Sequence, residues 1–305
     1  MARDPAHRAL GAWLEVDAAL EPLGAGHIND TWLVRHRGRG YVLQRISDAV
    51  FPDPVGVAKQ VAEVVAYLDA GHGRSSGIAV PPLMAGRSGE RWHRDESGVW
   101  RLWRQVTPAR TLEPLRTVAQ AESAGRAFGA FQAATADLDL SDRPDPIPGF
   151  LQLGEYLKVL DRMLDAADGM DGPAAEDAVA FIDARRDLAG ELSGRDRTIH
   201  GDCKVDNLLF HPRRDEVVAV IDLDTVMHGN WAWDFGDLVR SAAVSPRGGI
   251  DVDLFAALVR GFVPAAGVAA GSDDLVLAPR YVALMLGVRF LTDHLAGDRY
   301  FKVSV

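Results

Sequence analysis

Two short polar clusters, separated by one predicted hairpin, constrain this chain more than any other feature. The first cluster is HGDCKVDN, from His200 to Asn207, and the second is VIDLD, from Val220 to Asp224. Apolar, β-rich residues lie between the clusters and around them, so each cluster falls on a loop next to a strand. This pattern predicts a loop, a hairpin and a carboxylate at the end of the returning strand, all facing one cleft.

The residue types in these clusters are the ones that phosphoryl transfer requires. A carboxylate orients the attacking hydroxyl, oxygen ligands hold Mg²⁺ on the phosphates, and cations balance the developing negative charge. We predict that Asp202 is the base and that Lys204 reaches the transferring phosphate. Asn207 and Asp222 are predicted metal ligands, because amide and carboxylate oxygens suit Mg²⁺. Asp224 either binds the metal or supports a residue that does.

The order of predicted elements indicates an α+β fold with two lobes. Runs rich in β-branched and aromatic residues dominate the first third of the chain, and helical periodicity dominates the remainder. We predict a small β-rich lobe over residues 1–104 and a larger, mainly helical lobe over residues 105–305. This is the layout of the protein-kinase-like fold, with both polar clusters in the larger lobe.

We expect ATP and Mg²⁺ to bind in the cleft between the lobes. The linker residues Gln105, Val106 and Thr107 would meet the adenine, mainly through backbone groups. The returning small-lobe strand carries Gln44 and Arg45 where protein kinases have a lysine for the phosphates. Arg45 is the candidate cation, although strand alternation turns it to the face opposite Gln44.

Two further features of the sequence have alternative interpretations. Glu63, on the first helix of the small lobe, either pairs with Arg45 or lies on a solvated helix face. Trp231 and Trp233 either stack on a sugar or pack in the core, and their spacing favours the core.

Composition excludes several classes of protein. The chain has 305 residues and a formal net charge of −10, which argues against binding to nucleic acid or to an anionic membrane. Its single cysteine, Cys203, excludes an internal disulfide and a zinc cluster. The sequence shows neither a leader nor a long uncharged apolar run. We therefore expect a soluble, cytoplasmic protein whose partners are ATP and a small molecule, and leave its oligomeric state open.

The C-terminal half resembles the aminoglycoside phosphotransferase family of small-molecule kinases. Members show HGDxxxxN, then IDx[DE], then a downstream aspartate. This sequence matches with its stretches from His200 to Asn207 and from Ile221 to Asp224, and with Asp234. The resemblance implies that Asp234 ties the loop to its neighbours, and we expect His200 to hold the loop without joining the reaction.

A longer resemblance, over almost the whole chain, is to the N-acetylhexosamine 1-kinases. The matching stretches are GHINDT (26–31), YVLQRI (41–46), IDLDTVM (221–227), GVRFLTDHL (287–295) and GDRYFK (297–302). That family phosphorylates the anomeric hydroxyl of N-acetylglucosamine or N-acetylgalactosamine with ATP and Mg²⁺. The resemblance implies that Arg289 and Tyr300 line a sugar pocket. His27 and Asn29 either contact the substrate or order the small-lobe loop.

Two alternatives stay open at this point. The same chemistry would serve an aminoglycoside, another amino sugar, homoserine or choline, although Arg289 in the pocket argues against a polycationic aminoglycoside. The missing small-lobe lysine would also suit a nucleotide-binding pseudokinase that regulates a partner. Intact Asp202, Asn207 and Asp222 argue against that second alternative.

Overall fold

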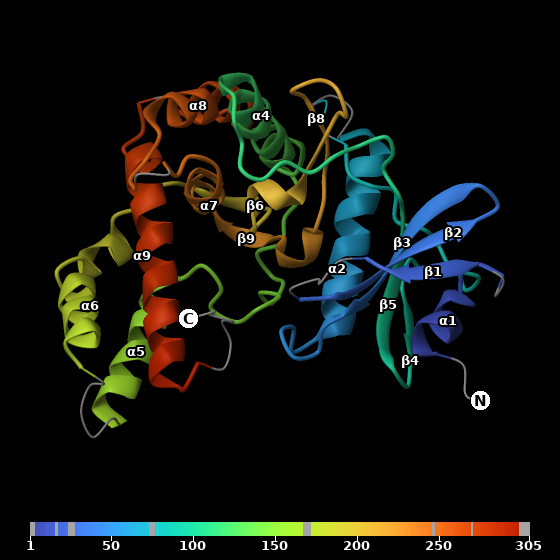
Figure 1. Ribbon diagram of the computed structural model, residues 1–305, viewed down its shortest axis with the longest axis horizontal. Helices are drawn as coiled ribbons and strands as arrows, with labels where there is room; N and C mark the ends of the chain where they lie inside the picture. Colours follow the sequence, from blue (N-terminus) through green and yellow to red (C-terminus); the bar gives the residue numbers. More distant parts are fainter. Residues whose placement is uncertain are drawn as a thin grey trace.

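A computed structural model gives the fold of the chain. It describes residues 4–15, 18–23, 28–72, 77, 79–166, 172–245, 248–269 and 271–298. A β-sheet built from the first third of the chain lies beside a helical part built from the remainder, with helix α2 between them (Figure 1). The predicted α+β architecture is therefore confirmed.

The elements of the described chain follow the labels of Figure 1. The strands are β1 (Ala19–Pro22), β2 (Asp30–His36), β3 (Arg39–Ile46), β4 (His93–Asp95), β5 (Gly98–Arg104), β6 (Asp196–Ile199), β7 (Leu208–Phe210), β8 (Val217–Val220) and β9 (Met227–Asn230). The α-helices are α1 (Pro5–Leu10), α2 (Pro54–Tyr67), α4 (Val118–Ala134), α5 (Leu153–Ala166), α6 (Pro173–Asp183), α7 (Trp231–Ala242), α8 (Val252–Ala266) and α9 (Asp274–Leu295). The short turns are η1 (Leu68–His72), η2 (Arg186–Gly190), η3 (Val205–Asn207) and η4 (Leu223–Thr225).

The predicted hairpin of β2 and β3 lies at the centre of the small-lobe sheet, whose strand order is β1-β2-β3-β5-β4. The strands pair antiparallel up to His36 opposite Arg39. Arg37 and Gly38 form the turn with φ values of 49° and 74°. Two successive positive φ angles are typical of the tight turn that matches strand twist, so the turn takes two residues and β3 begins at Arg39.

The two faces of the small-lobe sheet have different chemistry. One face packs on α1 through large apolar side chains (Val34, Tyr41, Leu43, Trp100 and Leu102). Alternate residues of a strand point to opposite faces, so the residues between these face α2 and the large lobe. On that second face Gln44 of β3 is the direct cross-strand partner of Arg101 of β5.

The helical lobe is built on two close helix pairs, α4 with α8 and α7 with α9. Glycine permits the close approach of α4 and α8, because a Cβ on Gly129 of α4 would lie 2.6 Å from the carbonyl oxygen of Phe262 on α8. Helices α5 and α6 flank the other side of α9 (Figure 1). This framework supports β6, β9 and the predicted β7–β8 hairpin, which the structure confirms.

The chain crosses between the lobes directly after β5. Gln105 is still bonded to the small lobe, since its backbone N–H donates to the Gly40 carbonyl (3.1 Å). Arg110 already pairs with Phe210 of β7, through bonds of 2.9 and 2.8 Å. The residues from 105 to 109 thus connect the sheet to the β7–β8 hairpin.

Helix α9 is the one helix of the described ranges that is long and apolar enough to cross a membrane. Half of the relevant stretch is buried inside the protein. Tyr281, Met285 and Val288 on α9 share an apolar core with Leu157 and Leu160 of α5. This packing is that of a core helix.

Candidate functional site

Asp234, in the first turn of α7, holds the loop that begins the first polar cluster. Its carboxylate accepts the backbone N–H groups of His200 (2.9 Å) and Gly201 (2.8 Å), and the side-chain amide of Gln132 (2.8 Å). Gly201 has a φ of 80°, a conformation that favours glycine. The predicted role of Asp234 as a tie for this loop is confirmed.

His200 connects the two polar clusters from inside the core. It is fully buried, with Phe128 and Phe131 packed against its ring edge-on. Its Nδ1 accepts the Asp202 backbone N–H (3.3 Å), so Nε2 carries the proton and donates to the Ile221 carbonyl (3.0 Å). Burial lowers the pKa of this imidazole, which keeps it neutral. The ring therefore holds the loops together, as predicted.

Asp202, the predicted base, contacts two residues that follow it closely in the sequence. Lys204 Nζ lies 2.6 Å from Asp202 Oδ2, and the Asn207 amide donates to the same oxygen (2.9 Å) and to the Asp202 carbonyl (2.8 Å). The Asp202 side chain is 19% exposed, and Oδ1 has no hydrogen bond among the described residues. Asp202 is thus fixed by one oxygen and able to accept a hydroxyl proton with the other.

Lys204 stays charged in this environment. Burial opposes its charged form, but the carboxylates of Asp202, Asp222 and Asp237 outweigh that effect and raise its pKa. A cation next to the base stabilises negative charge that develops on a transferred group.

Asp222 lies where β8 ends, in a left-handed conformation with a φ of 64°. Ile221 just before it donates its backbone N–H to the Asn207 carbonyl (2.9 Å), which joins the two clusters. Burial raises the pKa of Asp222 to about 7, and the negative charges of Asp224 and Asp202 add to this. A carboxylate in such a position is stabilised by a bound cation.

The donor set around Asp222 fits a divalent cation of the Mg²⁺ type. Asn207 uses its amide N–H group on Asp202, which leaves its oxygen as a neutral ligand. No three His, Cys, Asp or Glu side chains converge as a metal site within the described ranges. Two protein oxygens completed by phosphate oxygens and water are what Mg²⁺ sites with nucleotides use.

Asp224 is occupied by partners from the small lobe. Its Oδ1 forms an ion pair with Arg101, and its Oδ2 accepts the Asn29 amide (2.7 Å). The side chains of Arg101 and Asp224 are 1% and 3% exposed. Asn29 is 8% exposed and its Oδ1 accepts the Ser47 backbone N–H (3.0 Å). Of the alternatives for Asp224 and Asn29, this arrangement favours the ordering roles.

Arg101 and Asp237 are candidate site residues that we did not predict. Arg101 is the charged residue in the apolar strand segment VWRLW. Its side chain alternates with those of Trp100 and Leu102, and a charge at an inward-facing position of such a strand is unusual enough to indicate a site residue. Asp237 on α7 pairs with Arg240 (2.8 Å), and burial raises its pKa to about 6. Its Oδ2 is buried without a hydrogen bond among the described residues. Only the tertiary neighbours identify Asp237.

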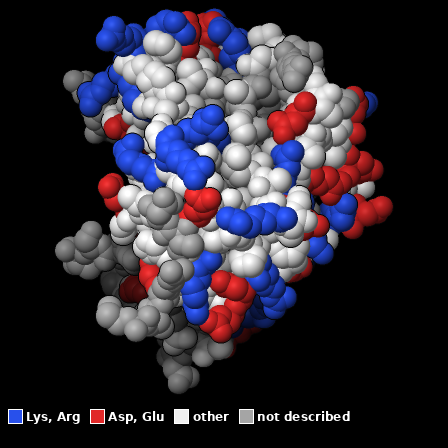
Figure 2. Space-filling model, turned by 90° about the vertical axis from the view of Figure 1, so that its right-hand side faces the viewer, with Lys and Arg blue, Asp and Glu red and all other residues white. Residues whose placement is uncertain are grey.

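Arg45 lies apart from the cluster, on the outer side of the small-lobe sheet. It donates to Asp30 (2.9 Å) and to the Ser97 carbonyl (3.1 Å). Glu63 pairs with Arg143 of the large lobe (2.8 Å), so the alternative of a Glu63–Arg45 pair is wrong. Basic and acidic side chains are interspersed over the small-lobe side of the molecule (Figure 2).

The remaining predicted residues lie in separate places. Gln105, Val106 and Thr107 form the linker, and Thr107 is exposed. Arg289 on α9 lies over the rings of Tyr156 (5.4 Å) and Phe150 (6.0 Å). Two more predicted substrate residues, His27 and Tyr300, lie outside the described residues.

The two tryptophans of α7 are core residues. Trp231 stacks on Phe262 and Trp233 stacks on Tyr281, with ring centroids 6.1 and 6.2 Å apart. The core interpretation is therefore confirmed.

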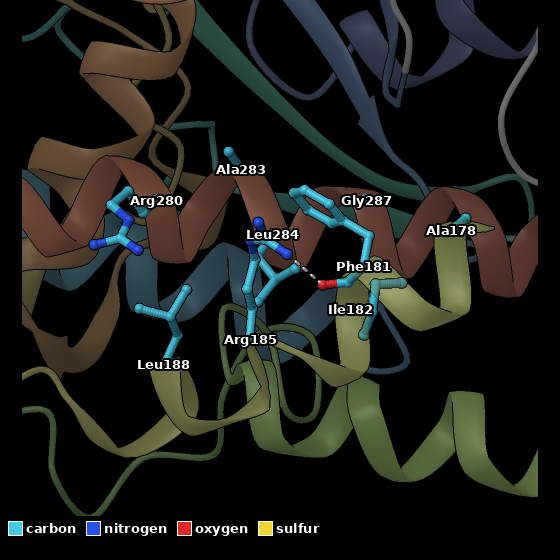
Figure 3. Close-up of a pocket in the computed structure, with 9 residues that line it drawn as sticks. All are labelled: Ala178, Phe181, Ile182, Arg185, Leu188, Arg280, Ala283, Leu284 and Gly287. Carbon is cyan, nitrogen blue, oxygen red and sulfur yellow. Dashed lines mark hydrogen bonds between the residues drawn. The ribbon is translucent and has the colours of Figure 1, made fainter.

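A cavity of the helical lobe lies apart from both polar clusters. It holds about 520 Å³ between α6 and α9 and is lined mainly by apolar side chains (Figure 3). Arg185 covers the Phe181 ring at 3.6 Å and donates to the Phe181 carbonyl (2.9 Å). No residue from 200–224 lines this cavity, so the chemistry and not the cavity size locates the candidate site.

Comparison with known proteins identifies the family and the fold of the chain. The chain matches the phosphotransferase enzyme family over residues 19–268. One similar solved structure is an amicoumacin kinase in complex with AMP-PNP, Ca²⁺ and Ami, with 14% sequence identity and a TM-score of 0.64 over 97% of this chain and 87% of that one. A second is an aminoglycoside-3'-phosphotransferase of type VIII, with 20% identity and a TM-score of 0.56 over 93% of this chain and 97% of that one. A third is a microcompartment-associated aminopropanol kinase, with 18% identity and a TM-score of 0.55 over 97% of this chain and 99% of that one. At these identities the likeness shows a shared kinase-like fold.

The matched residues extend from β1 to the end of α8 and include Asp202, the candidate metal ligands and the aspartate that holds their loop. The chain belongs to the phosphotransferase enzyme family.

Proposed function

We propose that this protein is an ATP-dependent small-molecule kinase that phosphorylates a sugar hydroxyl, the anomeric hydroxyl of an N-acetylhexosamine. The observation that carries the phosphotransfer part is the contact between Asp202, Lys204 and Asn207 beside Asp222. One carboxylate oxygen is fixed while the other is left for the acceptor, which is the arrangement that a hydroxyl-activating base requires.

The proposed roles follow from these contacts. Asp202 orients the acceptor hydroxyl and takes its proton as the bond to phosphorus forms. Asn207 and Asp222 hold Mg²⁺ on the phosphates, and Lys204 stabilises the charge of the transferred group. Asp224 supports this loop through its small-lobe partners.

The acceptor assignment is supported by the sequence resemblance to the N-acetylhexosamine 1-kinases. Arg289 lies over Tyr156 and Phe150, and a cation beside aromatic rings suits the polar edge and apolar face of a sugar. We propose that Arg289, together with Tyr300 and His27, recognises the acceptor. Because an aminopropanol kinase and an aminoglycoside-3'-phosphotransferase are among the similar structures, the activity assay also includes acceptors of these two kinds.

The assignment of ATP and a divalent cation is supported by the amicoumacin kinase, which is in complex with AMP-PNP and Ca²⁺. We propose Mg²⁺ for this protein, because the candidate ligands are oxygens and Mg²⁺ shares its sites with phosphates. The linker from Gln105 to Thr107 is the proposed adenine contact. We expect the reaction to take place in the cytoplasm, where ATP is supplied.

The test is an ADP-release assay with ATP, Mg²⁺ and a panel of N-acetylhexosamines, amino sugars, aminoglycosides, aminopropanol, choline and homoserine. We expect turnover with an N-acetylhexosamine, a sugar 1-phosphate product by ³¹P NMR, and a loss of roughly 10²–10⁴-fold in Asp202→Asn. This variant keeps the shape of the side chain and removes its basicity.

Other results would change the proposal in defined ways. Turnover with another acceptor would keep the mechanism and reassign the substrate. ATP binding without turnover on any acceptor would favour the pseudokinase. Full activity of Asp202→Asn would show that another group is the base.

A further inference from the structure

The small lobe needs a cation that its returning strand does not provide. In kinases a lysine on this strand binds the nucleotide phosphates, whereas β3 here has Gln44, which lies opposite Arg101 on the face toward the large lobe. Arg45 lies on the other side of the sheet, with Asp30 and Ser97 as its partners. A cleft-facing cation therefore has to come from another strand.

Arg101 of β5 occupies the position directly opposite Gln44. Its Nε donates to Gln44 Oε1 (3.0 Å), which also accepts the Trp103 ring N–H (2.8 Å). The Arg101 guanidinium lies 5.2 Å from the centre of the Trp103 ring. Gln44 thus orients Arg101 on the same face of the sheet as itself.

The far end of the same guanidinium reaches the second polar cluster in the other lobe. One of its terminal nitrogens, Nη1, pairs with Asp224 Oδ1. Asp224 lies in the turn that directly follows Asp222, the candidate metal ligand. The contact with Asp224 therefore ties Arg101 to the loop proposed to hold Mg²⁺ beside the phosphates.

The other terminal nitrogen, Nη2, is buried and has no hydrogen-bond partner among the described residues. A buried charged N–H group without an acceptor is unfavourable, and such groups are rare in folded proteins. An arginine that only joined Asp224 to the sheet would have no use for this fixed extra donor. A phosphate oxygen is the acceptor that a guanidinium fork matches best.

We propose that Arg101 replaces the small-lobe lysine: Nη1 holds Asp224, and Nη2 donates to an α- or β-phosphate oxygen of the bound nucleotide. The inference depends on the proposed function, because it requires a nucleoside triphosphate in the cleft. It makes Arg101 a phosphate-binding residue that at the same time links the small lobe to the second polar cluster, which contains Asp222 and Asp224.

The test compares ligands with and without phosphates across a mutant cycle. Calorimetry gives Kd for ATP·Mg²⁺, ADP·Mg²⁺ and adenosine with the wild type, Arg101→Lys, Arg101→Met, Asp224→Asn and the Arg101→Met/Asp224→Asn double variant. The double variant removes both charges of the buried pair, so it guards against misfolding when Asp224 loses its partner. Arg91→Met removes a small-lobe arginine whose partner is Asp69, and is the matched control.

We expect ATP and ADP to bind roughly tenfold or more weakly to Arg101→Met and to the double variant, the loss typical of a charged hydrogen bond. Adenosine should bind all variants within about twofold of the wild type, and Asp224→Asn and Arg91→Met should lose much less ATP affinity than the double variant.

Three results would overturn this inference. The first is a double variant that binds ATP as tightly as Asp224→Asn, and the second is an equal loss for adenosine and ATP. Both would leave the proposed function standing. The third, a wild type that binds neither ATP nor adenosine, would overturn the inference and the proposed function together.

Discussion

The loop from His200 to Asn207 and the inner face of the small-lobe sheet both contribute charged groups to the candidate site, but they are built differently. In the loop, Asp202 is held by Lys204 and Asn207, two and five residues further along the chain. On the sheet, Arg101 reaches Asp224 across 123 residues of sequence. Asp202 is therefore held by local contacts within its own lobe, and the sheet contributes only when both lobes have folded and met.

The largest effect is expected where the loop meets the core of its own lobe. Asp234→Ala leaves the buried backbone N–H groups of His200 and Gly201 without an acceptor and removes one of the two acceptors of the Gln132 amide. It should lower the free energy of unfolding by about 3–5 kcal/mol. Urea unfolding followed by circular dichroism measures this change.

The matched control for that variant is Asp53→Ala, which removes the exposed N-cap of α2 and should cost only about 1 kcal/mol. Equal losses for the two variants would mean that the loop does not depend on Asp234.

A smaller effect is expected in the pH dependence of stability, and it comes from Asp222 in the second polar cluster. Burial, Asp224 and Asp202 raise the pKa of Asp222 to about 7, while Lys204 and Arg101 oppose the shift. Between about pH 4 and pH 7 the folded protein keeps a proton that the unfolded chain has lost, so metal-free stability falls as pH rises through this window.

Mg²⁺ should reverse this trend, because it binds the ionised carboxylate. We expect Mg²⁺ to raise Tm more at pH 8 than at pH 6, and Asp222→Asn to abolish the difference. Thermal unfolding with Mg²⁺ or with a chelator measures it. Equal stabilisation at both pH values, or an unchanged response of Asp222→Asn, would remove Asp222 from the metal site.

The smallest effect is expected on the outer face of the sheet. Arg45 is 36% exposed and its partner Asp30 is 55% exposed, and exposed ion pairs contribute about 0–1 kcal/mol. Arg45→Gln should therefore change ATP affinity by less than about twofold and leave Tm nearly unchanged. A tenfold loss of ATP affinity would instead return Arg45 to the phosphate site and weaken the case for Arg101.

Local patterns predicted much of the fold, and short or irregular segments account for most of the differences. The hairpins β2–β3 and β7–β8 were predictable from β-rich runs around turn residues. The edge strands β1 and β4 were not, because a short edge strand depends on the pairing of its neighbour. Helix α6 ends at Asp183, and Arg186 just beyond it bonds to Asp183 and Asp161, a long-range contact that local periodicity does not show.

By itself, the sequence determined the order of the lobes, the catalytic hairpin and the spacing of Asp202, Asn207 and Asp222, because each depends on neighbours within a few residues or on strand and helix periodicity. The tertiary structure decided which face of the small-lobe sheet meets the other lobe. It thereby turned Arg101 toward the large lobe, and gave Asp224 a partner in both Arg101 and Asn29. Strand alternation limits a side chain to one of two faces, but only packing against the second lobe determines which face becomes the site.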